Sequence, residues 1–216
     1  ATGNWERPIY YGTTVNSDTY HGLEGYFQLE GLMYRIVPIQ SNRQWGVGGV
    51  NTTIMYDNLM NKYRFRSIAD ENVYIDENKG RIIANYRNQF ARLANALVDE
   101  GKKDSALTVL NKSMELIPTK TVPLNYFAIL LVEGYYRAGD KTKALEYSSM
   151  LMNQSVSQLN YILIHADRKH LQGLYNDIQL NLAILQELYK LADKYEKGTH
   201  LQQIYKEFER YMSMLQ

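Results

Sequence analysis

The side chains best suited to metal chemistry gather near residue 167. His165, Asp167 and His170 are all of the types that bind zinc. The two histidines are five residues apart, which turns their rings to different faces of a helix, whereas a zinc-binding helix spaces its pair at four. We interpret them as ordinary surface or helix-end histidines, and we expect neither a metal site nor a cofactor.

Two acidic pairs, Asp70–Glu71 and Asp76–Glu77, are the next candidates. A calcium loop needs alternating ligands and a glycine at its sharp turn, and this segment has neither. Asp76 instead suits the N-cap of a helix, with Glu77 in the first turn. The sequence also lacks a Gly-x-Ser-x-Gly elbow and a convergent acid, base and nucleophile, so we expect the chain to have no catalytic residues.

Basic and aromatic residues alternate in Lys62–Arg66. In a strand, Tyr63 and Phe65 would share one face, and Arg64 and Arg66 the other. Two interpretations stay open. The arginines contact an anion or a sugar phosphate, because guanidinium forks suit phosphate, or they form a solvated basic face. They are candidate ligand contacts, together with Trp45.

A glycine-rich stretch, Gly46–Gly49, follows Trp45. It lacks the Lys-Ser/Thr that completes a phosphate loop, and it does not stand between a clear strand and a clear helix. We predict a flexible connection.

The elements that must position these residues change in character near residue 76. Residues 1–75 read as a small mixed α/β region, with a strand in Arg7–Val15, a short helix in Leu23–Gly31, a strand in Met33–Ile39 and a helical turn in Tyr56–Met60. Pro38 places the second strand at an edge or ends it.

Residues 76–216 read as helical repeats with a terminal capping helix. Gly101–Leu107 and Gly139–Leu145 share a glycine, four polar residues and Ala-Leu, and Ala106 and Ala144 are 38 residues apart. This pattern is typical of tetratricopeptide (TPR) helix–turn–helix repeats. A third, weaker pair contains Ala166 and Gly173, and the last helix spans residues 199–215. The predicted fold is therefore mainly α, a TPR-like α–α superhelix preceded by the small α/β region.

The composition argues against several kinds of partner, site and segment. The net charge of +1 gives no electrostatic case for nucleic acid or an anionic membrane. The absence of cysteine excludes disulfides and thiolate metal sites. The apolar run Phe127–Val132 is far too short for a membrane span. The 19 tyrosines against 5 phenylalanines favour half-wet packing and adaptable surfaces, or reflect compositional drift.

Four blocks resemble a known family. They are Trp5–Tyr10, Tyr26–Ile39, Met55–Lys62 and Arg87–Ala94, and they resemble the C-terminal region of Bacteroidetes-type multispanning membrane proteins similar to protein O-mannosyltransferases. The resemblance covers the chain to about residue 145. It implies that the catalytic acid and the lipid-linked donor site belong to a membrane half that this chain does not contain. The start at Ala1, without Met, leads us to expect a piece of a longer protein.

The resemblance implies an extracytoplasmic domain on the periplasmic face, tethered to a membrane only through its parent. The first hypothesis is a non-catalytic accessory domain whose TPR-like helices hold a protein segment or the parent's own membrane domain. The alternative is a glycan- or acceptor-binding module. It depends on an exposed Trp45 ring with Arg64 and Arg66, because sugars stack on exposed aromatic faces.

Overall fold

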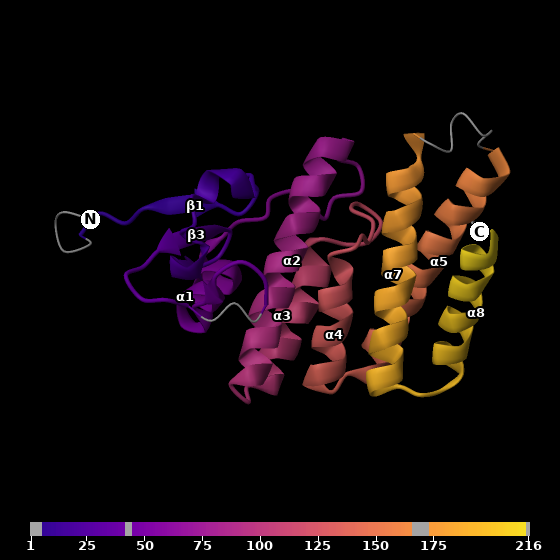
Figure 1. Cartoon of the computed structure of the whole chain (residues 1–216). Coiled ribbons are helices and arrows are strands. Elements are labelled where there is room, and N and C mark those ends of the chain that lie inside the picture. Colours follow the sequence, from indigo (N-terminus) through magenta and orange to yellow (C-terminus); the bar gives the residue numbers. More distant parts are fainter. Residues whose placement is uncertain (1–5, 42–44, 166–172, 215–216) are drawn as a thin grey trace. The chain divides into compact units, whose positions relative to one another are not determined.

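The computed structural model describes residues 6–41, 45–165 and 173–214, and the chain divides into two compact units, Ala1–Pro123 and Leu124–Gln216 (Figure 1). Long helices dominate, with a small strand region near the N-terminus, which confirms the mainly α class. The composition changes near residue 76, whereas the first compact unit continues to Pro123 because its first long helix packs on a second one that ends at Leu116.

The first unit begins with a four-stranded sheet in the order β1-β3-β2-β4. Strand β3 pairs antiparallel with both β1 and β2, and β2 pairs parallel with β4. Three short helical segments accompany the sheet before the long helices start. The bounds are β1 Tyr10–Gly12, β2 Phe27–Leu29, β3 Met33–Ile36, β4 Gly49–Val50, 3-10 turns at Ser17–Tyr20 and Glu24–Tyr26, and α1 Thr52–Asp57, which runs into a π-turn at Asn58–Lys62.

The short helix predicted for Leu23–Gly31 is wrong. After one 3-10 turn the segment becomes β2, in which Phe27 and Leu29 are buried and Gln28 is half-buried. This alternation is what a strand needs when one of its faces lies on a core. Phe27 stacks on Tyr34 of β3 with ring centroids 5.4 Å apart, and this cross-strand pair stabilises the hairpin. Pro38 was expected either to place its strand at a sheet edge or to end it. The second expectation is confirmed, because β3 is a central strand and ends at Ile36.

The glycines of Gly46–Gly49 lie in a loop, as predicted, and β4 begins at its last residue. Gly48 has a φ of +71°, and a Cβ there would lie 2.5 Å from the carbonyl oxygen of Phe27. Any side chain would therefore push the loop off β2. Close backbone approach explains why the loop contains glycine.

Two antiparallel helices complete the first unit: α2 Glu77–Asp99 and α3 Lys103–Leu116. The Asp76 side chain accepts a hydrogen bond from the Lys79 amide at 2.9 Å, which confirms the predicted cap. Gly101 has a φ of +78° and ends α2, as predicted. The apolar face of α2 lies in the core, since Phe90, Leu93 and Ala94 are fully buried.

The second unit contains α4 Ala128–Ala138, α5 Lys141–His165, α7 Tyr175–Tyr195 and α8 Thr199–Met214. Gly139 ends α4 in the left-handed region. Helix α5 packs against α4, α7 and α8, and α7 packs against α4 and α8. Each helix of this unit thus contacts its neighbour in sequence and the next one along (Figure 1). Ala166 of the third predicted pair lies outside the described residues.

Candidate functional site

Trp45 is half-buried against the end of α2. Its indole Nε1 donates to Asp99 Oδ2 at 2.5 Å, and beside it Thr52 donates to Glu100 at 2.7 Å. The recess at this point is small, about 170 Å³, and is lined by Trp45, Gly48, Val50, Thr52, Ala96, Asp99 and Glu100. The ring is therefore held by the protein's own groups.

Arg64 and Arg66 lie elsewhere in the same unit. Lys62–Arg66 forms no strand: the backbone is extended at Tyr63 and a turn begins at Arg66. The alternation considered for a strand is nevertheless present, because Tyr63 and Phe65 are half-buried and both arginines are exposed. They border the Arg64/Arg66 groove, a cavity of about 630 Å³ that does not include Trp45. Its lining residues are Leu32, Met33, Lys62, Tyr63, Arg64, Phe65, Arg66, Ile68 and Tyr86.

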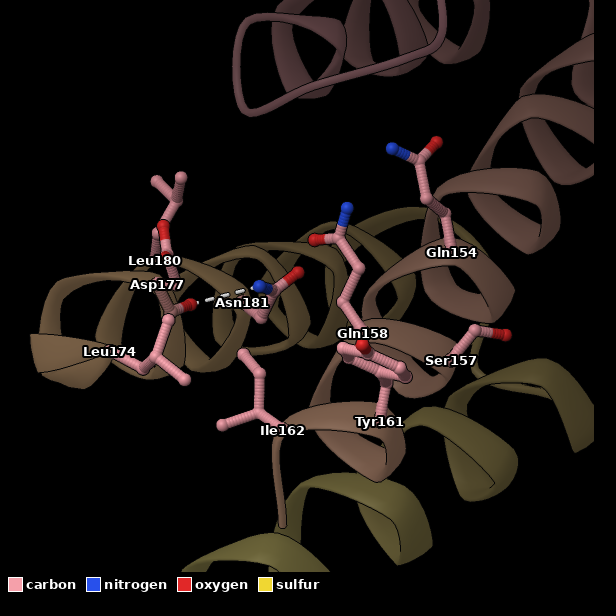
Figure 2. Close-up of a pocket in the computed structure, with 9 residues that line it drawn as sticks. All are labelled: Gln154, Ser157, Gln158, Tyr161, Ile162, Leu174, Asp177, Leu180 and Asn181. Atoms are coloured by element: carbon pink, nitrogen blue, oxygen red, sulfur yellow. Dashed lines mark hydrogen bonds between the residues drawn. The ribbon is translucent and has the colours of Figure 1, made fainter. Parts of the chain in front are cut away.

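The second unit has a groove that the sequence analysis missed. The α5–α7 groove has a volume of about 690 Å³ and carries carboxamide side chains from both helices (Figure 2). Gln158 of α5 and Asn181 of α7 both line this groove, whereas the carboxamide of Gln154 points away from Asn181 (Figure 2). No motif marks these residues, so only packing reveals them. The lining residues are Gln154, Ser157, Gln158, Tyr161, Ile162, Leu174, Asp177, Leu180 and Asn181.

The groove exists because consecutive helices differ in length. Helix α4 has 11 residues and α5 has 25, which correspond to about 16 and 38 Å. The later turns of α5 thus extend past the start of α4. Gln154 marks the transition, because its Nε2 donates to the Leu124 carbonyl, ahead of α4, at 2.8 Å. Beyond it, Tyr161 and Ile164 are 68% and 73% exposed.

The polar groups of this groove are partly held in place. Asn181 is 3% exposed, and its Nδ2 donates to the Asp177 carbonyl at 2.8 Å (Figure 2). Its side-chain oxygen is thereby oriented away from the helix backbone. Tyr161 and Leu180 offer exposed aromatic and aliphatic surface beside these amides. The arrangement suits a ligand with alternating hydrogen-bonding and apolar groups.

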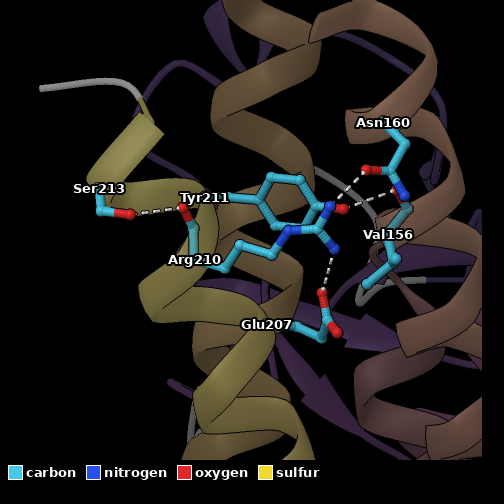
Figure 3. A network of polar contacts seen from close by, with 6 residues as sticks. All are labelled: Val156, Asn160, Glu207, Arg210, Tyr211 and Ser213. Carbon is cyan, nitrogen blue, oxygen red and sulfur yellow. Dashed lines mark hydrogen bonds and ion pairs between the residues drawn. The ribbon is translucent and has the colours of Figure 1, made fainter. Parts of the chain in front are cut away.

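Helix α8 attaches to α5 at two levels. Near its end, buried Tyr211 donates to the Val156 carbonyl at 3.2 Å, and Arg210 contacts Glu207 at 3.4 Å and Asn160 at 3.5 Å (Figure 3). Near its start, the Ser148 Oγ and His200 Nε2 atoms are 2.7 Å apart. These contacts hold the side of α5 that faces α8.

The Ser148–His200 pair resembles half of a hydrolytic triad, but its burial argues against catalysis. Ser148 is 2% exposed and His200 is 7% exposed, so a substrate cannot reach the hydroxyl. The hydrogen bond to His200 satisfies the buried Ser148 hydroxyl. The pair is structural.

We expect the second unit to lose stability as the pH falls through the His200 titration. Burial lowers the pKa of His200, against the opposing effect of the Glu196 carboxylate, which pairs with Lys141 at 3.0 Å. The unfolded chain then binds a proton more readily than the folded one. Stability is full above about pH 6.5 and declines from there down to the lowered folded pKa. Far-UV circular dichroism during urea unfolding at several pH values measures this decline.

The matched variants separate the histidine from the other titrating groups. In His200→Gln, the free energy of unfolding should change less over this pH window than it does in the wild-type chain. Ser148→Ala should lower that free energy by about 1–3 kcal/mol at neutral pH, because the buried ring nitrogen loses its partner. A His200→Gln profile that keeps the wild-type slope would show that another group is responsible.

The remaining sequence candidates form no site that the structure describes. Asp167 and His170 lie outside the described residues, as does the His165 side chain. Within the described ranges, no group of three His, Asp or Glu side chains is arranged to hold a metal. None of the described helices is both long and apolar enough to cross a membrane.

One comparison with known proteins gives a match. Residues 1–54 match the family described as TMEM260-associated domain 2, a family linked to O-mannosyltransferase-like membrane proteins. The matched range contains two of the four resembling blocks, Trp5–Tyr10 and Tyr26–Ile39. It also contains all four strands of the sheet, β1 to β4. No curated protein and no solved structure matches the chain. The N-terminal quarter of the chain is therefore similar to a TMEM260-associated domain.

Proposed function

We propose that this chain is a non-catalytic accessory domain of an O-mannosyltransferase-like membrane protein. On this proposal it lies on the extracytoplasmic, periplasmic face and holds an extended protein segment. The match of residues 1–54 to a TMEM260-associated domain supports the membrane-protein context. The α5–α7 groove is the observation that carries the binding role.

A TPR-like arrangement of the second unit forms part of this proposal. Two features favour it: the contacts of each helix with the next and the next but one, and the left-handed Gly139 between α4 and α5. Stacked helix pairs bury one continuous core and leave a lengthwise surface for a ligand. The short α4 departs from evenly matched helix pairs, and this departure opens the groove.

The groove chemistry favours an extended polypeptide as the occupant. A peptide backbone presents alternating N–H and C=O groups, and carboxamides such as Gln158 and Asn181 both donate and accept. Ile162 and Leu174 contribute apolar surface between them, which suits the side chains that alternate along an extended chain. Among the described residues of the lining, Asp177 is the one that carries a charge, so a neutral or weakly basic segment fits best.

The glycan alternative has less support. It depended on an exposed Trp45 ring acting together with Arg64 and Arg66. Trp45 is half-buried, donates to Asp99 and lines a different cavity from the two arginines. Stacking on a sugar needs a free ring face beside hydrogen-bonding groups, and these three residues do not converge on one ligand.

Site-specific photo-crosslinking tests the proposal. A photoreactive phenylalanine analogue replaces Tyr161 in the groove or, as a control, Tyr74, which is 86% exposed in the first unit. Each protein is irradiated with detergent-solubilised envelope membranes, and the crosslinked peptide is identified by mass spectrometry. We expect the Tyr161 position, but not the Tyr74 position, to crosslink one extended segment.

A synthetic peptide of that segment then gives the affinity. Gln158→Ala/Tyr161→Ser should weaken its binding at least tenfold. The matched control is Gln202→Ala/Tyr205→Ser, which removes the same side-chain types at the same spacing from exposed positions on α8. Equal binding by both double variants, or equal crosslinking at both positions, would refute a peptide groove between α5 and α7.

A further inference from the structure

The Arg64/Arg66 groove has a charge imbalance that the proposed function does not use. Both arginines are exposed, and among the described residues no carboxylate lies within ion-pair distance of either guanidinium. The third cation on the rim, Lys62, is paired with Asp57 at 2.6 Å. None of the described residues that line the groove is acidic. Two guanidinium groups at its edge are therefore available to an anion.

The floor of the groove is apolar and holds the arginines in position. Phe65 packs on Phe90 with ring centroids 5.6 Å apart and on Tyr86 at 6.4 Å. Tyr63 lies so close to Gly31 that a Cβ there would be 2.6 Å from the phenol oxygen. With Tyr63 and Phe65 anchored inward, the extended backbone turns the intervening and following arginines outward. Their Cα atoms are then about 7 Å apart along the segment.

We propose that this groove binds a phosphate ester with an apolar organic group. Guanidinium groups bind phosphate oxygens through paired, charge-assisted hydrogen bonds. Beside them, Leu32, Met33 and Ile68 provide apolar surface, and Met33 is 44% exposed. The phosphate would contact the two arginines at the rim, and the organic group would pack on the apolar floor. A lipid headgroup and a soluble organic phosphate share this chemistry.

Two probes separate those sources. The soluble probe is 1-naphthyl phosphate, with inorganic phosphate for comparison, titrated by calorimetry at low salt. The membrane probe is a phosphatidylcholine vesicle that contains phosphatidic acid, tested by co-sedimentation. Binding of 1-naphthyl phosphate, at least tenfold tighter than inorganic phosphate, is the expected result. Vesicle binding that 1-naphthyl phosphate competes away would assign a lipid headgroup, and no vesicle binding would assign a soluble ester.

The variants test each half of the groove. Arg64→Gln/Arg66→Gln should weaken 1-naphthyl phosphate binding at least tenfold. Arg7→Gln/Lys103→Gln, which removes the same charge from exposed positions outside the groove, should change it less than twofold. Met33→Gln should weaken 1-naphthyl phosphate but leave inorganic phosphate unchanged.

Thermal unfolding of each variant verifies that the exposed substitutions leave the fold intact. Absence of 1-naphthyl phosphate binding to the wild-type chain would overturn the proposal. Equal losses in the two double variants would also overturn it, because they would reduce the effect to net charge. The outcome does not depend on the α5–α7 groove.

Discussion

Replacing Arg87 with Met is expected to destabilise the first unit by about 3–5 kcal/mol. Arg87 is 2% exposed and points from α2 into the segment that follows α3. Its guanidinium donates to the carbonyl oxygens of Ile117, Val122 and Pro123 at 2.9, 2.6 and 3.1 Å. Methionine fills similar space but donates nothing, so buried carbonyls lose their partners.

Tryptophan fluorescence during urea unfolding measures this loss. Trp45 is half-buried and belongs to the first unit, so its fluorescence reports that unit even when the second unfolds separately. The control is Arg81→Met on the same helix, where the side chain is 72% exposed and pairs with Glu77. A midpoint for Arg87→Met that equals the Arg81→Met midpoint would show that the three carbonyls find other partners.

Replacing Arg92 with Met is expected to cost about 2–4 kcal/mol in the same unit. Arg92 is 3% exposed and joins three segments of the unit. It donates to the Tyr34 hydroxyl at 2.8 Å, to the Val47 carbonyl at 2.6 Å and to Gln89 at 3.3 Å. Burial lowers the pKa of Arg92, and its contact with Tyr34 opposes this shift.

The geometry also predicts the effects of two related substitutions, Arg92→Lys and Tyr34→Phe. Arg92→Lys should remain destabilised, because one ammonium group cannot reproduce a fork that reaches Tyr34 and Val47 in different directions. Tyr34→Phe should cost about 1 kcal/mol, and its effect should largely vanish in an Arg92→Met background. Additive costs for the two changes would disprove the coupling.

Hydrogen exchange would locate the consequence of Arg92→Met. The Val47 carbonyl belongs to the glycine loop that leads into β4, so amide protection in residues 47–50 should fall more than protection in α3. Equal loss in both places would indicate global destabilisation instead of release of the loop.

Arg87 and Arg92 show what a helical sequence pattern can predict and what it cannot. The sequence predicted the cap at Asp76 and the helix that follows it correctly. It could not place Arg87 and Arg92 inside, because an arginine in an amphipathic pattern is ordinarily solvated. Their burial depends on carbonyls of other segments. The Arg87–Ala94 block that carries the resemblance thus contains two of the main tertiary contacts of the unit.

For the candidate ligand contacts, too, the sequence predicted the local features but not the tertiary ones. Alternation in Lys62–Arg66 predicted exposed arginines and inward aromatic side chains, and the structure has both. The interpretation of Trp45 with Arg64 and Arg66 as ligand contacts treated the three residues as one surface. The structure places Trp45 on Asp99 and in another cavity, a separation that depends on how the glycine loop folds back on α2.

By itself the sequence determined the features that depend on neighbouring residues: the helix cap at Asp76, the turns at Gly101 and Gly139 and the mainly α class. Local sterics and periodicity act over a few residues, so their effects can be predicted from the sequence. The tertiary structure alone decided the strand β2, the buried arginines, the Ser148–His200 pair and both grooves. Each of these depends on distant segments meeting, and hydrophobic pattern does not specify which segments those are.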